Sequence, residues 1–390
     1  MPHLKVKPFD SSKIDTKIQT CRMITLHARS LSSTDELIGI KHNDEEFLLQ
    51  VKPGKEETLV KYDKVTRPLK VNLIKEALDI VSKELALDIV SSNISLSSTK
   101  VLWSSKYFKK IKDFENIIYP KNKLSVEVGF GSGKHLLYQA QQNPDTLFIG
   151  IEIHTPSAQQ VLKQISLQNL DNIWVVNYDA RLFLEMLPSN SCHQIFVHFP
   201  IPWDKKPQRR VISKPFVAEA MRVLSVGGRL ELRTDSDNYF WYALKTFFSV
   251  PKVTVDVRKN EALQVISKYE ARWKRQEKDI YDVYVNADIV SEDKILLVDF
   301  NFNIVKYKHG MELKIPKEAF VSDEYFIHFE RCYKTDDERL LIKCAFGSFD
   351  RPEHKYIILD KTSCRYFVSP PVKTRINYKA HKKIMELLDV

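Results

Sequence analysis

Three acidic residues in the middle of the chain end or follow short apolar runs, and a glycine-rich segment follows the first of them. Residues 127–133 read Glu-Val-Gly-Phe-Gly-Ser-Gly, and Glu152 and Asp179 follow the next two apolar runs. Glycines in such a segment let the chain turn tightly and let a ligand approach the backbone. An acid about 20 residues after the last glycine is placed to bind ribose hydroxyls. This pattern predicts a nucleoside-type cofactor site.

The glycine spacing and the acids together indicate which cofactor that is. The spacing is G-x-G-x-G, and Leu136 stands where a pyrophosphate-binding loop would keep a glycine. Three carboxylates suit a cationic ligand and disfavour a pyrophosphate, so we expect S-adenosylmethionine rather than NAD. The expected cofactor-binding residues are Glu127, Gly129, Gly131, Gly133, Glu152 and Asp179. The alternative is a tight turn with acids that only cap helices.

A second segment with possible chemistry runs from Phe199 to Arg210. Pro200 and Pro202 flank one residue and exclude a helix, so a stiff loop is expected after the apolar run 194–198. An aromatic face and cations are what a protein needs to stack on an unpaired base and hold its phosphates. The candidate substrate-binding residues are Trp203, Lys205, Lys206, Arg209 and Arg210. The alternatives are a proline-rich connection with a solvated basic tail, and a Trp203 that packs in the core.

These segments need a scaffold, and the middle of the chain predicts one in which strands and helices alternate. Strands are expected at 124–128, 147–153, 173–177, 194–198 and 229–233. Helices are expected at 134–142, 156–168, 180–187 and 215–226, the last closed by Gly227-Gly228 as a C-cap. Repeated β-α units of this length predict an α/β fold with a Rossmann-like, doubly wound parallel sheet. Such sheets carry their sites at the carboxyl ends of the strands.

Two smaller β-rich α+β modules are expected on either side of this sheet. Strands at 23–27, 36–41, 47–51 and 58–62 precede a helix at 69–83, and strands at 325–329, 339–345, 356–359 and 364–368 precede a helix at 378–388. We hypothesise that the flanks are a duplicated module whose copies pair in space; chance similarity is the alternative. The expected domains are 1–115, 116–290 and 291–390.

Composition limits the possible partners. The 390 residues carry a net charge of +10 and 43% apolar residues, which favours a folded protein with an anionic partner, nucleic acid first. The five cysteines are scattered and form no C-x-x-C pair, so neither a zinc site nor a disulfide framework is expected. No run approaches a transmembrane length, so we expect no membrane, no metal and a cytoplasmic location.

With these residues in hand, the chain resembles the bacterial tRNA (guanine-N7)-methyltransferases from about residue 124 to 288. The segments that carry the resemblance are 127–133, 148–154 (Phe-Ile-Gly-Ile-Glu-Ile-His), Asp179-Ala180, 199–203 with its basic tail, Arg233-Thr-Asp235 and Ser267-Lys-Tyr-Glu270. The resemblance implies that Glu127, Glu152 and Asp179 contact S-adenosylmethionine and that Lys205 and Asp235 contact tRNA. It implies methyl transfer to N7 of a guanine in the tRNA variable loop.

The sequence departs from this family's pattern in the proline-framed loop. Ile201 lies between the prolines where the family has an aspartate assigned to cofactor binding or catalysis, and the basic tail is about two residues shorter. Guanine N7 carries a lone pair and no proton, so methyl transfer requires alignment and stabilisation of developing positive charge rather than a base. Asp235 and Glu270 are the expected catalytic residues, and Ser267 joins them in substrate binding.

Each of these residues has a structural alternative. Asp235 could cap the helix that follows Thr234, Glu270 could pair with Arg272 or Lys274, and Ser267 could be only an N-cap. His154 and His198 are expected to be structural residues at strand ends.

The rival functions are a non-catalytic tRNA-binding or scaffold protein and a methyltransferase for another RNA or a protein. The intact acids Glu127, Glu152 and Asp179 argue against the first. The basic tryptophan loop favours RNA without choosing which one, and the sequence does not fix the oligomeric state.

Overall fold

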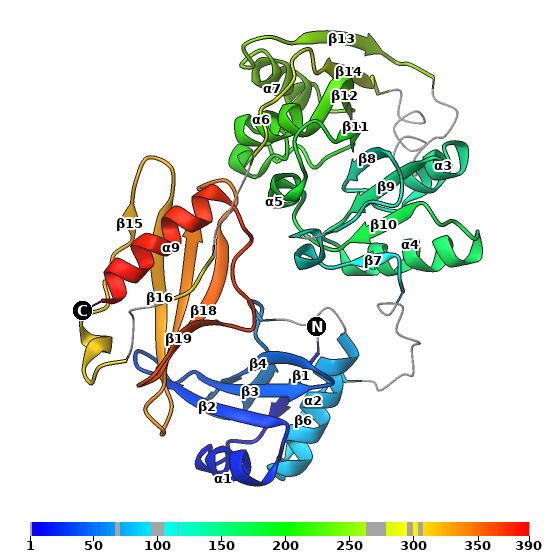
Figure 1. The fold of residues 1–390 in the computed structure, drawn as a ribbon. Coiled ribbons are helices and arrows are strands. Elements are labelled where there is room, and N and C mark those ends of the chain that lie inside the picture. The colour runs from blue at the N-terminus through cyan, green and yellow to red at the C-terminus, as the bar shows by residue number, and fades with distance from the viewer. Residues whose placement is uncertain are drawn as a thin grey trace. The chain divides into compact units, whose positions relative to one another are not determined.

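The computed structural model describes residues 2–66, 71–94, 105–115, 117–262, 278–294, 299–302 and 307–389. The chain divides into two compact units: a central unit, Leu102–Leu297, and a flanking unit made of Met1–Val101 together with Val298–Val390. The two flanks of the chain therefore form one body (Figure 1). The domain boundaries predicted after residues 115 and 290 remain predictions.

The described part of the central unit holds an eight-stranded sheet in the order β13-β14-β12-β11-β8-β9-β10-β7. Its strands are β7 Phe108–Lys109, β8 Lys123–Val128, β9 Thr146–Ile151, β10 Ile173–Val176, β11 Cys192–His198, β12 Leu224–Thr234, β13 Thr254–Lys259 and β14 Tyr281–Asn286. All neighbours pair in parallel except β14, which is antiparallel to both β12 and β13. The predicted doubly wound α/β fold is confirmed, with an antiparallel edge that the sequence prediction lacked.

Helices cover both faces of this sheet. They are α3 Lys134–Gln142, α4 Thr155–Leu167, α5 Ala180–Phe183, α6 Lys214–Val223 and α7 Asp237–Phe247. Figure 1 shows α3 and α4 on one side of the strands and α5, α6 and α7 on the other. The apolar faces of the strands and of α5, α6 and α7 form one buried cluster, which includes Val126, Ile195, Phe216 and Ala243. The opposite face of β8 and β11 carries polar side chains, Glu127 and His198 among them.

Strand order reverses between β8 and β11, so the carboxyl ends of these two strands form a topological switch point. The chain passes from β8 to β9 and β10 on one side, and from β11 to β12 on the other. Ligands of open α/β sheets bind at such a switch point. Val197 pairs with Val128, so the ends of β8 and β11 lie side by side.

The predicted C-cap at Gly227-Gly228 is wrong. Helix α6 already ends at Val223, and both glycines lie inside β12. Cys192 pairs with Leu224 but Gln194 pairs with Arg229, so β12 carries extra residues opposite β11. Gly227 has φ 78°, and a Cβ on Gly228 would lie 2.9 Å from the carbonyl oxygen of His193. The glycines therefore allow a bulge in a strand rather than closing a helix.

The flanking unit is built around a sheet in which both flanks take part. The described strands run in the order β19-β18-β17-β16-β2-β3-β4-β5-β1-β6, and β15 pairs with β16 off this path. The N-terminal elements are β1 His3–Val6, α1 Ser12–Thr20, β2 Ile24–Ser30, β3 Glu36–His42, β4 Glu45–Lys52, β5 Thr58–Tyr62, α2 Val71–Glu84 and β6 Ile89–Ser92. The C-terminal elements are β15 Phe320–Val321, β16 Phe326–Lys334, β17 Leu340–Gly347, β18 Glu353–Leu359, β19 Cys364–Phe367 and α9 Arg375–Leu388.

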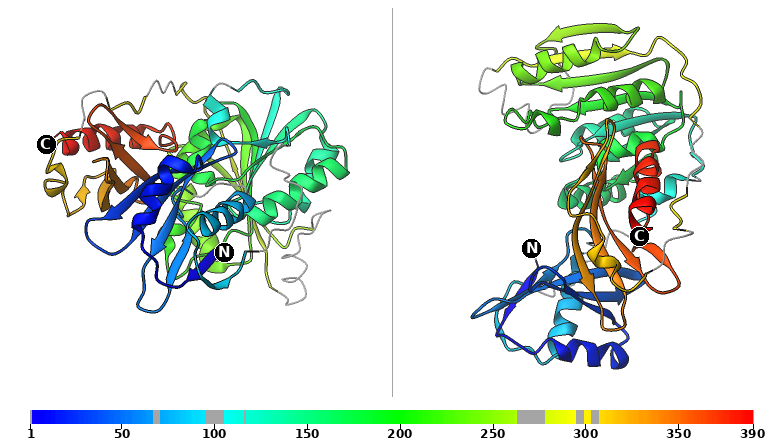
Figure 2. Two further views of the ribbon diagram at one scale, coloured as in Figure 1. Left: turned by 90° about the horizontal axis from the view of Figure 1, so that it is seen from below. Right: turned by 90° about the vertical axis from the view of Figure 1, so that its left-hand side faces the viewer.

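Strand order and helix placement agree between the two halves of the flanking unit. Each half has four consecutive antiparallel strands followed by a helix, β2 to β5 with α2 and β16 to β19 with α9. Figure 2 shows α9 along the strands of its half and α2 along its own. The equivalent strands β2 and β16 pair antiparallel with each other, Ser30 opposite Tyr333. This is the agreement that the duplication hypothesis requires, and β1, α1 and β6 have no counterpart among the described residues of the second half.

The two halves share a core on the faces that the helices do not cover. Leu37 and Leu48 from the first half cluster with Leu341 and Phe367 from the second. The hydroxyl of Tyr356 donates to Asp63 Oδ2 at 3.1 Å across the same contact, and both residues are buried. All five cysteines lie in described segments and are unpaired. Of the described helices, none combines the length and apolar character that a membrane span requires.

Candidate active site

The three predicted cofactor acids end three neighbouring parallel strands. Glu127 lies near the end of β8, Glu152 follows β9 directly, and Asp179 lies three residues beyond β10. Because β8, β9 and β10 pair in parallel, all three carboxylates lie at one edge of the sheet. Glu127 is 3% exposed and Glu152 is 8% exposed. The edge therefore concentrates negative charge at the switch point.

The glycine segment between β8 and α3 contains two kinds of glycine. Gly129 and Gly131 have φ of 70° and 53°, and a Cβ on either would meet no atom closer than 4.0 Å. Their outer sides are open space in which a ligand can approach the backbone. Gly133 has φ 72°, but its Cβ would lie 2.2 Å from Val161 Cγ2 on α4. Gly133 therefore serves the packing of α3 on α4.

Glu152 holds the glycine segment in place. Its Oε2 accepts a hydrogen bond from the Gly131 backbone amide at 2.9 Å, and its Oε1 accepts from the His154 amide at 2.8 Å. Each carboxylate oxygen has a second lone pair, so Glu152 can accept from a ligand hydroxyl as well. Asn177 donates to the Glu152 carbonyl at 2.5 Å and ties the end of β9 to the end of β10.

Asp179 caps a helix, as the alternative interpretation expected. Its Oδ1 accepts from the Arg181 amide at 3.0 Å at the start of α5, and Arg181 Nη2 donates to its Oδ2 at 2.6 Å. The side chain is 35% exposed, so part of the carboxylate faces solvent at the sheet edge. Capping and ligand binding use different lone pairs, and the two roles are compatible.

The predicted substrate loop follows β11 on the other side of the switch point. Phe199 and Trp203 have φ of 49° and 46°, so the loop bends sharply at both residues. The Phe199 amide donates to the Arg233 carbonyl at 2.7 Å, which anchors the loop to β12. Trp203 is half-buried, and the Arg209 guanidinium carbon lies 5.2 Å from its ring centroid. Trp203 is not a core residue.

The four predicted cations of this loop differ in exposure. Lys205, Lys206 and Arg209 are exposed. Arg210 is 7% exposed: its Nε donates to the Pro202 carbonyl at 2.7 Å and its Nη2 to Asp204 Oδ1 at 3.2 Å. Its guanidinium also lies 4.4 Å from the Tyr242 ring centroid. Arg210 therefore holds the shape of the loop. Ile201, in the place of the family aspartate, is 63% exposed.

Asp235 follows β12 and lies at the same edge of the sheet. Lys278 Nζ donates to its Oδ2 at 3.2 Å, and the Asp235 side chain is 19% exposed. The helix α7 is capped by Ser236, which accepts from the Tyr239 amide, so Asp235 is not the cap. Glu270 and Ser267, together with Arg272 and Lys274, lie outside the described residues.

Sequence reasoning missed a cluster of histidine and carboxylate side chains that includes Glu127. His135 on α3 donates from Nδ1 to Glu127 Oε2 at 2.8 Å, and His198 at the end of β11 lies with Nε2 2.9 Å from Glu231 Oε1 on β12. Burial alone would lower the pKa of His135, but the Glu127 carboxylate raises it above its ordinary value. Burial would raise the pKa of Glu231, yet the hydrogen bond from His198 lowers it.

A buried ion pair borders this cluster. Arg233 Nη1 donates to Asp282 Oδ1 at 2.7 Å, and the two side chains are 1% and 0% exposed. Glu231 and Arg233 alternate with apolar residues in the run Leu-Glu-Leu-Arg, which was the available signal. It indicates that one face of β12 carries charged groups. Which groups oppose them depended on the register of β11 and β14.

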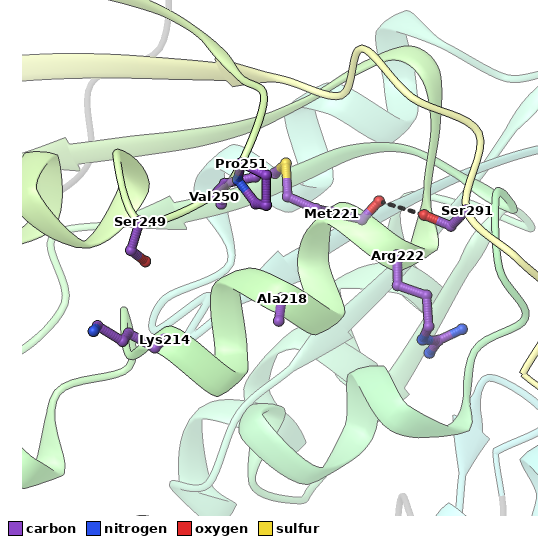
Figure 3. A pocket seen from close by; sticks show the side chains of 8 residues that line it. All are labelled: Lys214, Ala218, Met221, Arg222, Ser249, Val250, Pro251 and Ser291. Atoms are coloured by element: carbon purple, nitrogen blue, oxygen red, sulfur yellow. Dashed lines mark hydrogen bonds between the residues drawn. The ribbon is translucent and has the colours of Figure 1, made fainter.

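A separate surface hollow of about 420 Å³ lies on the outer side of α6 (Figure 3). Its lining residues are Lys214, Ala218, Met221, Arg222, Ser249, Val250, Pro251 and Ser291. None of them is a predicted site residue. In the described parts of the chain, no group of three or more His, Cys, Asp and Glu side chains is arranged to hold a metal ion.

Comparison with known proteins extends the resemblance to the flanks. The family model described as "Putative methyltransferase" matches residues 121–283. Proteins named tRNA (guanine-N(7)-)-methyltransferase from Wolinella succinogenes, Campylobacter jejuni (strain 81-176) and Helicobacter hepaticus are 40%, 41% and 35% identical. Each alignment covers 91% of this chain and 91% of the relative.

These alignments correct one expectation from the sequence. The resemblance seen in the motifs covered only residues 124–288, whereas the relatives share most of the flanks as well. A solved antibiotic-related methyltransferase aligns at 21% identity and a TM-score of 0.34 over 42% of this chain and 88% of its own, which is too distant to bear on function. With 35–41% identity to curated members over 91% of its length, the chain belongs to the tRNA (guanine-N(7)-)-methyltransferase family.

Proposed function

We propose that this protein transfers a methyl group from S-adenosylmethionine to N7 of a guanine in tRNA. The observation that carries the proposal is the single sheet edge at which Glu127, Glu152 and Asp179 end three parallel strands while the basic tryptophan loop ends the next one. A cofactor on one side of the switch point and a nucleotide on the other would meet there. The relatives' names point to the same substrate.

The residues at this edge fit the cofactor. Open space beside Gly129 and Gly131 leaves room for a ligand against the backbone. Carboxylates of Glu127, Glu152 and Asp179 suit its positive charge and its hydroxyl and amino donors. When bound, S-adenosylmethionine supplies an electrophilic methyl group on a sulfonium. The task of the protein is then to hold and orient the reactants.

The loop that follows β11 is the proposed nucleotide platform. Trp203 offers a face on which a base can stack, and the exposed Lys205, Lys206 and Arg209 can contact phosphates on either side. Arg210 keeps Pro202 and Asp204 in position and so shapes the platform. We propose a guanine of the tRNA variable loop as the target, and a cytoplasmic location follows from that substrate.

Methylation of N7 leaves a positive charge on the purine. Asp235 lies at the edge beside this platform and can stabilise that charge, because a carboxylate favours positive charge that develops nearby. Its ion pair with Lys278 holds it at the end of β12. Ser267 and Glu270 complete the proposed site, and no group needs to remove a proton from N7.

The test is incubation of the protein with unmodified tRNA and labelled S-adenosylmethionine, followed by mapping of the methylated base. We expect 7-methylguanosine in the variable loop. A methyl group on another base or in another RNA would replace the proposed substrate. Tight tRNA binding without any methyl transfer would favour the scaffold function, for which the exposed Ile201 in place of an aspartate is the one supporting observation.

A further inference from the structure

Two histidines lie between two carboxylates at the switch point. The ring centroids of His135 and His198 are 4.5 Å apart, and Phe196 contacts both rings. On the outer sides, Glu127 pairs with His135 and Glu231 with His198. The side chains of these four residues are between 4% and 12% exposed. In space, the four groups therefore follow one another as the Glu127 carboxylate, the His135 imidazole, the His198 imidazole and the Glu231 carboxylate.

The place of this chain of groups ties it to the cofactor site. Glu127 belongs to the three-acid edge, whereas Glu231 lies two strands away, beyond β11. Glu127 and Glu231 both pair with Phe196, from opposite sides, so they lie on the same face of the sheet as His198. His135 reaches this face from α3, immediately after the glycine segment. Its hydrogen bond to Glu127 joins the start of α3 to the charged face.

We propose that His135 is a positioning residue that fixes the Glu127 carboxylate for the cationic cofactor, and that its protonation state sets cofactor affinity. The inference rests on the proposed cofactor site and goes beyond it, since it adds a residue and a pH dependence to that site. The hydrogen bond from His135 Nδ1 selects one orientation of Glu127, and the ring excludes water from one side of the carboxylate.

His135 can change protonation without losing its place. Its Nε2 lies 3.2 Å from Gln139 Nε2, an arrangement in which the amide donates to a neutral imidazole. A flip of the amide would present its oxygen to a protonated ring, so Gln139 can serve both states. The charged groups that face His135 are Glu127 on β8, His198 on β11, and Glu231 and Arg233 on β12.

The sign of the effect follows from charge. The carboxylates hold the pKa of His135 above its ordinary value despite burial. Below that pKa the ring is cationic and offsets the Glu127 charge, so a cationic cofactor binds more weakly. Above it the ring is neutral while its Nδ1–H still donates to Glu127. Affinity therefore rises as pH rises through the pKa of His135, and by reciprocity binding releases part of a proton.

The experiment measures S-adenosylmethionine binding to the full chain by isothermal titration calorimetry at several pH values and in two buffers of different ionisation enthalpy. The wild-type Kd should fall about fivefold across the titration of His135, with release of a fraction of a proton. His135→Ala should weaken binding about tenfold because it removes a hydrogen bond to a charged group. His135→Asn places an amide nitrogen where Nδ1 was, so it should restore affinity to within about twofold but abolish the pH dependence.

Glu231→Gln tests the remote end of the cluster. The Glu231 charge raises the pKa of His135, so this variant should move the midpoint of the pH dependence downward and leave the Kd at high pH nearly unchanged. His193→Asn is the matched control, because His193 is exposed at the opposite end of the same strand as His198. Its binding curve should match the wild type at every pH.

Two results would overturn the inference while leaving the proposed function in place: His135→Asn with an unchanged pH dependence, or His135→Ala with wild-type affinity. A wild-type chain that does not bind S-adenosylmethionine at any pH would overturn both. Binding with the expected pH pattern but no methylation of tRNA would support the role of His135 and contradict only the proposed substrate.

Discussion

Two regions of this molecule place histidine between carboxylates, and they differ in how completely protein partners pair with the charged groups. In the flanking unit, His27 is 1% exposed, with Nδ1 2.9 Å from Asp15 Oδ1 and Nε2 2.7 Å from Glu36 Oε2. Arg29 Nη2 pairs with Asp15 at 2.5 Å and its Nη1 with Asp336 of the other half at 2.5 Å. Every charge in this cluster has a partner from the protein, and the cluster joins the two halves.

In the central unit, the corresponding groups lie at an open sheet edge. His135 Nδ1 donates a hydrogen bond to Glu127 Oε2, and open space surrounds Gly129 and Gly131 nearby in the chain. Residue types alone would not separate the two clusters. Their positions separate them: the cluster around His27 lies within a sheet that continues on both sides, and the cluster around His135 lies where strand order reverses. Charged groups that are all paired within a continuous sheet indicate a structural role, and charged groups at a switch point beside open backbone indicate a ligand.

The largest expected effect comes from a substitution in the cluster around His27. His27→Ala removes the hydrogen bonds of the imidazole to Asp15 and Glu36, and the free energy of unfolding should fall by about 3 kcal/mol, about 1.5 kcal/mol for each hydrogen bond to a charged group. Urea unfolding of the full chain measures it, with His193→Ala as the exposed control. The Kd for S-adenosylmethionine should stay within about twofold of the wild type. A large loss of cofactor affinity at unchanged stability would reverse the assignment of the two clusters.

At the sheet edge of the central unit, we expect the substitution of Asp235 to lower the rate of methyl transfer and to leave the free energy of unfolding nearly unchanged. Asp235→Asn keeps the shape of the side chain and removes its charge. We expect kcat/KM for tRNA methylation to fall about 100-fold, or about 2.7 kcal/mol, with unfolding changed by less than about 0.5 kcal/mol. Asp237→Asn, two residues along and exposed, is the control. Equal rates for wild type and Asp235→Asn would remove Asp235 from the site.

The same contrast explains what the sequence could and could not predict. The glycine segment, Glu152, Asp179 and the loop at Trp203 were found because each follows an apolar run, and parallel strands bring their ends together. Glu231 and Asp282 were missed because strand register sets their partners, and His135 because its partner depends on how α3 packs on the sheet. Glu231 meets His198 only because Phe196 and not its neighbour lies opposite it.

Non-local pairing also limited the prediction of the fold. The order of the four strands in each flank followed from alternating patterns, but the joining of β2 to β16 places Ser30 opposite Tyr333, far apart in sequence. The exposed four-residue strand β6 has no apolar face that could have marked it. The glycines of β12 were misassigned because Gly-Gly after an apolar helix is as typical of a cap as of a bulge.

Two glycines extend the comparison to the backbone. Gly133→Ala would bring a methyl group to 2.2 Å from Val161 Cγ2 at a φ of 72°, so we expect unfolding to become easier by about 2 kcal/mol. Gly129→Ala meets open space and should cost only about 1 kcal/mol of backbone strain, while it weakens S-adenosylmethionine binding more than Gly133→Ala does. Thermal unfolding and calorimetric Kd values separate the two effects. A larger loss of affinity in Gly133→Ala would place the ligand on the other side of the segment.

The smallest expected effect adds a carboxylate to the open edge. Ile201 is 63% exposed between Pro200 and Pro202, so Ile201→Asp should change stability little. A solvent-exposed charge near the reacting centre contributes about 1 kcal/mol, and kcat for tRNA methylation should rise about fivefold. Ile201→Asn is the matched control, with the same shape and no charge. If both variants gained equally, removal of an apolar side chain would be the cause. If Asp lowered kcat, the edge would already hold its full complement of negative charge through Asp235 and the three cofactor acids.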